Sequence, residues 1–220
     1  MDNITIRLEQ TSDYRETEEV VREAFWNVYS PGCTEHYLLH TMRGSSGFVR
    51  ELDFIAESGG RIIGAAVSQK GYILGDDGNR YGVLTLGPIA VLPSFQHRGT
   101  GRALIEHTRA AAADKGYRAI LLCGDPEYYR NAGFIAAEHY GIRTSGNRYA
   151  AALHACPLYR NALQGLAGRY FEDDIYLVDE AKAALFDKQF PPKEMLSGTP
   201  SQQRFKEVSA MVKEYPGKYF

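Results

Sequence analysis

Hydrophobic and polar positions repeat with two different periods near the start of the chain. Between residues 4 and 8 apolar and polar residues alternate, which is typical of a half-buried strand. Between residues 20 and 28 the apolar positions instead recur at the spacing of one helix face, until Pro31-Gly32 ends the run. The pattern therefore predicts a strand followed by an amphipathic helix, and residues 33–50 allow a second, shorter helix.

Strand-like patterning begins near Asp53. The runs FIAE and RIIGAAVSQ flank Ser58-Gly59-Gly60, which predicts two antiparallel strands joined by a glycine turn. A second turn at 75–79 leads into residues 82–92, which are almost wholly apolar. Such a run is expected of a strand covered on both faces, so this strand is predicted to lie in the middle of the sheet.

Residues 100–115 form the clearest predicted helix, with an apolar face, a charged face and Gly116 directly after it. Further on, the patterns predict a buried strand at 119–123, a short helix at 126–131, and last strands near 134–137 and 149–154. This order predicts an α/β fold of the α+β type, in which helices flank a mixed, mostly antiparallel central sheet.

The region after Cys156-Pro157 is richer in Gly, Pro and Tyr, but it still contains helix signals. One helix is predicted over 179–189, and another from Pro200, preceded by a capping box at Thr199 and Gln202. The last helix carries an apolar stripe that must pack on something: Phe205, Val208, Met211 and Val212. We expect a domain at 1–155 and a helical extension at 156–220, which packs on the core or forms the subunit contact of a homodimer.

The composition is that of an ordinary globular protein. Of 220 residues, 44% are hydrophobic and 24% charged, and the formal net charge is −2. Without a basic excess, nucleic acid is not an expected partner. The three cysteines have no metal-ligand spacing, so we expect free thiols and no metal site. No signal peptide and no run of about 18 apolar residues is evident, which predicts a cytoplasmic protein without a membrane span.

The segment that indicates chemistry is the strand TLGPIAVLP, followed at once by residues 94–102 and then by the amphipathic helix. The first N–H groups of a helix lack partners within the helix and carry partial positive charge, so they bind phosphate oxygens readily. Gly99 and Gly101 let the backbone approach a pyrophosphate closely, and Arg98 and Arg102 add positive charge beside it. The segment therefore predicts a phosphate-binding turn.

Two common phosphate-binding turns do not fit these residues. A dinucleotide fingerprint would need Gly or Ala at position 104, which is Leu104, and it would normally follow the first strand of a parallel sheet. A P-loop would need Lys and then Ser or Thr directly after its last glycine, where this chain has Arg102-Ala103. Both alternatives are excluded by the residues themselves.

The turn Gln96-His97-Arg98-Gly99-Thr100-Gly101 resembles the Q/RxxGxG/A turn of the GNAT superfamily of acetyl-CoA-dependent N-acetyltransferases. By element order the resemblance covers about residues 4–155. It implies that these six residues and Arg102 hold the CoA pyrophosphate, and that the backbone at Ile89 and Val91 binds the pantetheine arm. Gly87-Pro88 within the same strand independently indicates a bulge or a close ligand approach, so we expect the sheet to be splayed there.

A second segment, Tyr128 to Phe134, is similar to the family's YxxxGF motif, with Tyr129 four residues before Gly133. The resemblance implies that Tyr129 is the general acid that protonates the leaving CoA thiolate. Transfer from a phenol of pKa about 10 to a thiolate whose thiol has a pKa of about 8.5 is uphill by about 2 kcal/mol, which local hydrogen bonds could offset. Tyr128 could instead take this role, with Tyr129 as a packed aromatic residue.

The general base is where this chain departs from much of the family. Many members have a Glu on the central strand, whereas residues 82–92 contain no acid. Asp125 and Glu127 are the substitutes beside the tyrosine, although Asp125 could serve only as a helix cap. A base is needed most for a lysine-like amine, because freeing such an amine at pH 7 costs about 4.6 kcal/mol, against about 1 kcal/mol for an α-amino group.

Together these patterns predict an N-acetyltransferase that transfers the acetyl group of acetyl-CoA to a primary amine of a small molecule or peptide by direct attack. The alternative is a non-catalytic CoA-binding or sensing module that keeps the cofactor turn without turnover. A longer acyl donor is also compatible with the sequence.

Overall fold

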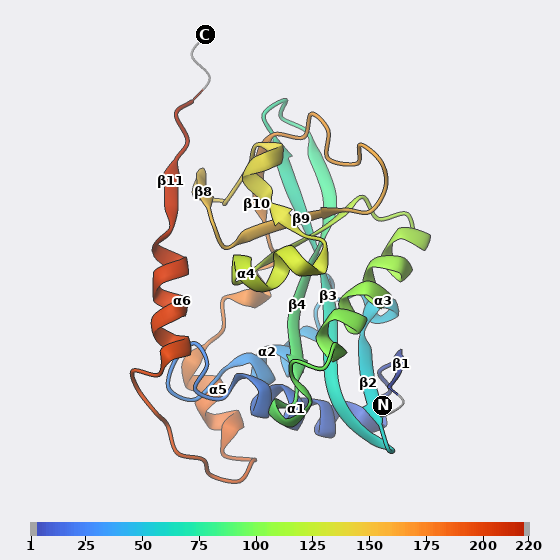
Figure 1. Cartoon of the computed structure of the whole chain (residues 1–220), viewed down its shortest axis with the longest axis vertical. Coiled ribbons are helices and arrows are strands. Elements are labelled where there is room, and N and C mark those ends of the chain that lie inside the picture. The colour runs from blue at the N-terminus through green and yellow to red at the C-terminus, as the bar shows by residue number, and fades with distance from the viewer. Residues whose placement is uncertain (1–3, 218–220) are drawn as a thin grey trace.

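A computed structural model describes residues 4–217, and its centre is a mixed sheet with helices on both sides (Figure 1). Within these residues the sheet has nine strands in the order β1-β2-β3-β4-β5-β9-β6, with β10 beside β3 and β7 beside β10. The strands are β1 (Thr5–Leu8), β2 (Phe54–Ser58), β3 (Arg61–Gly75), β4 (Arg80–Val91), β5 (Ala119–Cys123), β6 (Ile135–Ala136), β7 (Ile142–Arg143), β9 (Leu153–Pro157) and β10 (Gly168–Phe171). A separate pair joins β8 (Arg148–Ala150) to β11 (Val212–Glu214).

Six α-helices surround the sheet in the described part of the chain: α1 (Tyr14–Phe25), α2 (Glu35–Met42), α3 (Thr100–Asp114), α4 (Pro126–Tyr129), α5 (Glu180–Asp187) and α6 (Pro200–Ala210). The short helix α4 begins as its sequence predicted, with Asp125 accepting a hydrogen bond from the Glu127 N–H and with Pro126 in the first turn. Most strand pairs are antiparallel, and β4 with β5 and β7 with β10 are parallel. The predicted fold class is therefore confirmed.

The two central strands separate part of the way along their length. β4 pairs with β3 from Arg80 to Val91, but it pairs with β5 only at Leu84 and Thr85. The β3–β4 register shifts where β4 carries Gly87-Pro88, which is the bulge that the sequence indicated. Beyond Thr85 the edge of β4 that faces β5 is thus free of strand pairing.

Apolar side chains from both faces of the sheet close the core. The central strands contribute residues that are almost fully buried, as expected of strands covered on both sides. These include Ile62, Ile63, Leu84, Ile120 and Leu122, and they pack with helix residues Val21, Leu39, Leu104 and Ile105. The core therefore holds β4 and β5 in place where their pairing ends.

The C-terminal segment contains the two predicted helices, with one difference. The last helix ends at Ala210, so Met211 and Val212 do not lie on its apolar face. Met211 follows the helix, and Val212 begins β11. Val208 is buried, but Phe205 stays 44% exposed, so the predicted four-residue stripe is wrong as a continuous buried face. The predicted domain boundary at residue 155 falls within β9, and β10, which follows it, pairs with β3 of the central sheet. The division into a domain and an extension stays a prediction.

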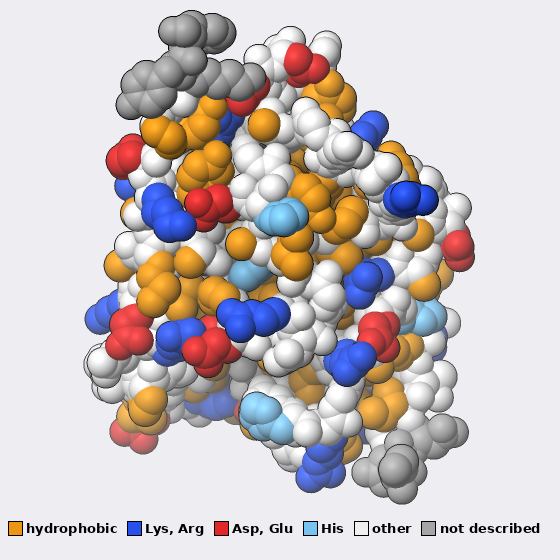
Figure 2. All heavy atoms as spheres, turned by 45° about the horizontal axis from the view of Figure 1, so that its top comes forward, with side chains coloured by type: hydrophobic (Ala, Val, Ile, Leu, Met, Phe, Trp, Pro, Cys, Tyr) orange, Lys and Arg blue, Asp and Glu red, His pale blue; other side chains and the backbone are white. Residues whose placement is uncertain are grey.

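Surface charge is mixed. On the face in Figure 2, basic and acidic side chains of the described residues are interspersed, with apolar side chains between them. Among residues 4–217, every helix is too short or too polar to span a bilayer. The cysteines are free thiols.

Candidate active site

A cavity of about 650 Å³ brings the two predicted motifs together. Its walls come from the end of β4, the turn before α3, and the segment around α4. The residues that line it are Ile89, Val91, Gln96, His97, Gly99, Gly101, Arg102, Glu127, Tyr128, Tyr129, Asn131 and Ala132. Seven of the nine predicted cofactor residues and the predicted acid thus face one hollow, although the two motifs are about thirty residues apart in sequence.

The start of α3 has the geometry of an anion site. Gly99 precedes the helix with φ of 92°, a left-handed conformation that favours glycine, and a Cβ there would meet nothing within 4 Å. The space beyond Gly99 is therefore open toward the cavity. The first turn of α3 carries no acidic residue, so the partial positive charge of the helix start is not cancelled there. These features fit the pyrophosphate of CoA.

Gly101 is the second position where a side chain would interfere. A Cβ at this residue would lie 2.5 Å from the hydroxyl oxygen of Tyr128. The Tyr128 side chain is 50% exposed, so its hydroxyl can move aside, and it lies over the turn rather than in the core. Tyr128 is therefore placed to contact a cofactor at the turn, and Tyr129 lies deeper.

The polar residues of the turn differ in what they contact. The Gln96 side chain donates to the Val91 carbonyl at 2.9 Å, which ties the turn to the end of β4. Arg102 is exposed and pairs with Glu106 at 2.7 Å. Two of the predicted residues do not line the cavity: Thr100 is buried with its hydroxyl toward the Phe95 carbonyl, and the Arg98 guanidinium lies 5.8 Å from the Phe95 ring centre. Their predicted cofactor contacts stay predictions.

The YxxxGF segment folds as it does because of Gly133 and Phe134. Gly133 has φ of 84°, and a Cβ there would lie 2.5 Å from Nη1 of Arg109. This turn sends Phe134 into the core, where it is fully buried, and the Phe134 N–H donates to the Tyr129 carbonyl at 3.2 Å. The glycine and phenylalanine therefore anchor the segment that carries Tyr129.

Tyr129 lies close to Gly124, the residue that follows β5. A Cβ on Gly124 would come within 2.1 Å of its ring, so only glycine leaves room there. The rings of Tyr128, Phe134 and His154 surround it, with centroids 4.9 to 5.9 Å away. Burial, and to a lesser degree the neighbouring Tyr29, raises the pKa of Tyr129 well above its usual value. The phenol is therefore protonated at neutral pH, as a proton donor must be.

Asp125 is engaged by two partners. Its carboxylate accepts two hydrogen bonds from Arg204, at 2.7 and 3.0 Å, and one from the Glu127 N–H at 2.9 Å. The hydrogen bonds from Arg204, the largest influence, hold the pKa of Asp125 below its usual range. This geometry makes Asp125 a weak base, and its predicted role as the general base stays a prediction.

Three site residues were missed from the sequence. Gly124 gives Tyr129 its place, and the Tyr176 hydroxyl donates to the Gly87 carbonyl at 2.9 Å, at the bulge where β4 leaves β5. Glu172 follows β10, burial raises its pKa, and its charge adds to the raised pKa values of Cys123 and Tyr176. Gly124 could have been found from the sequence, because it directly precedes the helix cap Asp125. Tyr176 and Glu172 could not, because they reach the site only when the distant C-terminal segment folds.

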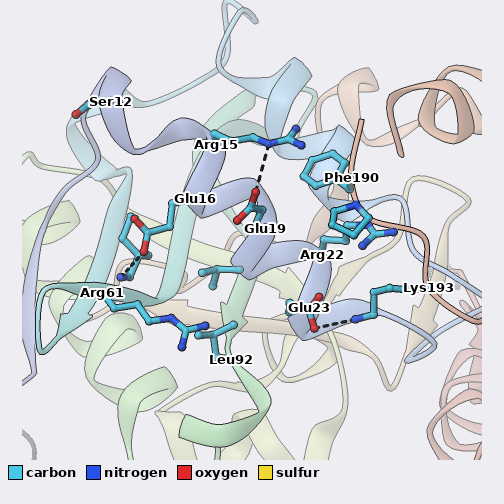
Figure 3. A pocket seen from close by; sticks show the side chains of 13 residues that line it. Ser12, Arg15, Glu16, Glu19, Arg22, Glu23, Arg61, Leu92, Phe190 and Lys193 are labelled. Atoms are coloured by element: carbon cyan, nitrogen blue, oxygen red, sulfur yellow. Dashed lines mark hydrogen bonds and ion pairs between the residues drawn. The ribbon is translucent and has the colours of Figure 1, made fainter. Parts of the chain in front are cut away.

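A larger hollow of about 730 Å³ lies elsewhere, along α1 (Figure 3). Two ion pairs join charged residues that line it: Arg15 with Glu19 at 3.4 Å, and Lys193 with Glu23 at 2.7 Å. None of the predicted site residues lines it. We therefore assign the chemistry to the smaller cavity, where the motifs meet.

Comparison with known protein families agrees with this assignment. Residues 50–136 match the family model of the acetyltransferase (GNAT) domain, a stretch that contains both the turn and the YxxxGF segment. By class, the protein is an acyltransferase. More particularly, residues 50–136 are similar to the acetyltransferase (GNAT) domain.

Individual relatives and structures are similar over most of the chain. The Escherichia coli K12 protein called uncharacterized N-acetyltransferase YhbS is 26% identical over 163 residues, which are 74% of this chain and 92% of that protein. The crystal structure of YhbS from E. coli in complex with CoA matches with a TM-score of 0.72 at 22% identity, over 81% of this chain and 94% of the other. A GNAT family acetyltransferase from Brucella melitensis in complex with acetyl-CoA gives 0.63 at 24% identity, over 80% and 99%. These structural likenesses establish the shared fold.

Proposed function

We propose that this protein transfers the acetyl group of acetyl-CoA to a primary amine of a small molecule or peptide by direct attack. The amine nitrogen bonds to the thioester carbonyl carbon, the carbon–sulfur bond breaks, and the CoA thiolate takes a proton from Tyr129. The observation that carries the proposal is the single cavity lined by both the glycine turn and Tyr129. A cytoplasmic location and a homodimer stay predictions.

The cofactor site would be formed by three elements. The N–H groups at Gly99 to Gly101 would bind the pyrophosphate at the start of α3, where the backbone is open to the cavity. The free edge of β4 at Ile89 and Val91 would bind the pantetheine arm, as the loss of pairing beyond Thr85 allows. The similar structures from E. coli and B. melitensis are complexes with CoA and acetyl-CoA, which supports acetyl-CoA as the donor.

Burial acts on both partners of the proton transfer. It raises the pKa of Tyr129, which by itself makes the phenol a weaker acid. A thiolate released in the same surroundings would be desolvated too, and desolvation raises the pKa of its thiol. The leaving thiolate therefore becomes more basic as the phenol becomes less acidic, and the transfer stays near balance.

The proton lost by the amine needs an acceptor. Asp125 is the predicted one, but its pairing with Arg204 keeps it ionised and weakly basic. Glu172 is a second carboxylate, whose charge acts on Cys123 at the end of β5, and burial raises its pKa. We propose that Asp125→Asn and Glu172→Gln be compared side by side, since only loss of the true base removes the acidic limb of the pH–rate profile.

The decisive experiment is a panel of amines screened for release of free CoA thiol from acetyl-CoA. Polyamines, aminoglycosides, amino acids and peptide N-termini would be tested with wild-type protein and with Tyr129→Phe. We expect at least one amine to support release, and Tyr129→Phe to lower kcat by about 100-fold or more, within the range for loss of a general acid. Affinity for acetyl-CoA should change by less than about 3-fold, because the turn at Gly99 is untouched.

Tyr128→Phe is the matched control, because it removes the neighbouring hydroxyl from the same helix. If Tyr128→Phe is the more damaging change, the acid is Tyr128. If acetyl-CoA binds but no amine in the panel gives thiol release, a non-catalytic CoA-binding role replaces the proposal.

A further inference from the structure

Helix α6 stands beside α4 (Figure 1), and Arg204 joins the two. Its Nε lies 2.7 Å from Oδ2 of Asp125, and its Nη2 lies 3.0 Å from Oδ1 of Asp125 and 3.2 Å from Oε1 of Glu127. A bidentate, charge-assisted pair of this kind fixes orientation as well as distance. Because Asp125 also caps α4, one carboxylate both starts the helix that carries Tyr129 and receives α6.

The start of α6 is held by the loop that follows α1. The backbone carbonyl of Asn27 accepts hydrogen bonds from the Thr199 hydroxyl at 3.1 Å and from the side-chain amide of Gln202 at 3.2 Å. One turn later, the ring of Phe205 lies 4.8 Å from that of Tyr29 in the same loop. Helix α6 therefore connects the α1–α2 loop to the helix of the proposed acid.

The segment before α6 is fastened to α1 as well. Figure 3 shows Phe190 and Lys193 against this helix, with Lys193 paired to Glu23. Asp187, at the end of α5, pairs with the buried Arg22 at 2.6 Å. These contacts fix where α6 begins, so the position of Arg204 is set by the body of the protein.

We propose that Arg204 is a positioning residue, which holds α4 in the geometry from which Tyr129 protonates the leaving thiolate. The inference rests on the proposed acid role of Tyr129. It gives Asp125 the task of cap and anchor, and it makes the C-terminal helix a determinant of turnover rather than of cofactor binding. A catalytic group displaced by about 1 Å can cost about 100-fold in rate, so a modest shift of α4 is enough.

Hydrogen exchange tests the positioning without any acceptor. Full-length Arg204→Gln should exchange the amides of residues 127–134 about 5-fold faster than the wild type, because α4 loses its partner on α6. Lys206→Gln removes an exposed positive charge from the same helix and is the matched control. Equal exchange in the two variants overturns the proposal, whether or not an amine substrate is known.

Kinetics with the amine found in the panel test the catalytic consequence. Arg204→Gln should lower kcat about 10-fold and leave KM for acetyl-CoA within about 2-fold. Asp125→Asn should do the same, and the double variant should be little worse than either single change, because both remove the shared Arg204–Asp125 pair. Independent, multiplying effects would overturn the proposal.

The pH–rate profile separates this role from a base at Asp125. If Asp125 were the base, loss of Arg204 would raise its pKa and move the acidic limb to higher pH, with the plateau rate retained. If Arg204 positions α4, the plateau falls and the limb stays in place. Failure of the proposed function is distinguishable, since normal turnover by Tyr129→Phe would remove the acid role while the exchange result still stands.

Discussion

The cofactor turn and the C-terminal segment are built in different ways. The cavity takes its whole lining from two short stretches, 89–102 and 127–132, and each stretch has its shape from glycines and a helix start close by in sequence. The C-terminal segment is placed by pairs distant in sequence, such as Arg22 with Asp187, 165 positions apart, and Asn27 with Leu196, 169 apart. The comparison teaches that local residues specify the chemistry, and that distant pairs specify where the helices around it stand.

The largest effect expected in the cofactor region comes from Gly101→Val. The new side chain would meet the Tyr128 hydroxyl and fill the space before α3, so affinity for acetyl-CoA should fall about 100-fold, or about 2.7 kcal/mol. Stability should stay equal or rise slightly, because valine is a better helix former than glycine. Isothermal titration calorimetry and urea unfolding measure the two quantities.

Gly82→Val is the matched control for this change. Gly82 lies on β4, is exposed, and has open space where a Cβ would stand. Its substitution should leave affinity within about 2-fold. If both valine variants bind acetyl-CoA like the wild type, the pyrophosphate does not lie at the start of α3. The glycine turn would then not specify cofactor binding.

The same division, between features set by nearby residues and features set by distant pairs, decides which parts of the structure the sequence predicts. The turn at Gly99, the cap at Asp125 and the buried strand at 119–123 depend on neighbours within a few residues, and each was predictable. The bond from Tyr176 to the Gly87 carbonyl, 89 positions away, was not, because no local pattern encodes a partner at that distance. The end of α6 at Ala210 was missed for the same reason, since pairing of β11 with β8 takes up the residues after it.

A pH effect should distinguish the C-terminal region. His36 on α2 is fully buried against Phe186 and Phe190, and burial, partly opposed by Asp187, lowers its pKa to about 4. Between pH 6.5 and 4 the unfolded chain therefore holds a proton that the folded protein lacks, so stability falls as pH falls through this window. We expect a loss on the order of 2 kcal/mol from pH 7 to pH 5, measured by urea unfolding.

The control compares slopes with pH rather than absolute stabilities. His36→Gln removes the titrating ring and should flatten the decline between pH 7 and pH 5, even if the variant is less stable throughout. His139→Gln, at an exposed position, should keep the wild-type slope. A wild-type slope in His36→Gln would mean that other groups cause the acid sensitivity, and that the packing of α5 on α2 is not a pH-dependent contact.

The smallest effect concerns whether α6 unfolds locally while the sheet stays folded. Thr199 caps α6: its hydroxyl oxygen accepts from the Gln202 N–H at 3.3 Å, and the hydroxyl donates to the Asn27 carbonyl. Thr199→Ala should therefore lower the stability of α6 by about 1 kcal/mol. We expect this loss in local opening, with amide exchange over 201–210 about 5-fold faster and the urea midpoint nearly unchanged, because α6 meets the body mainly through polar contacts and one buried apolar residue, Val208. Ser209→Ala, exposed near the helix end, serves as the control and should change neither quantity. A full 1 kcal/mol loss in global unfolding would show instead that α6 folds as one unit with the sheet, and the contrast between the two regions would then be one of sequence distance alone.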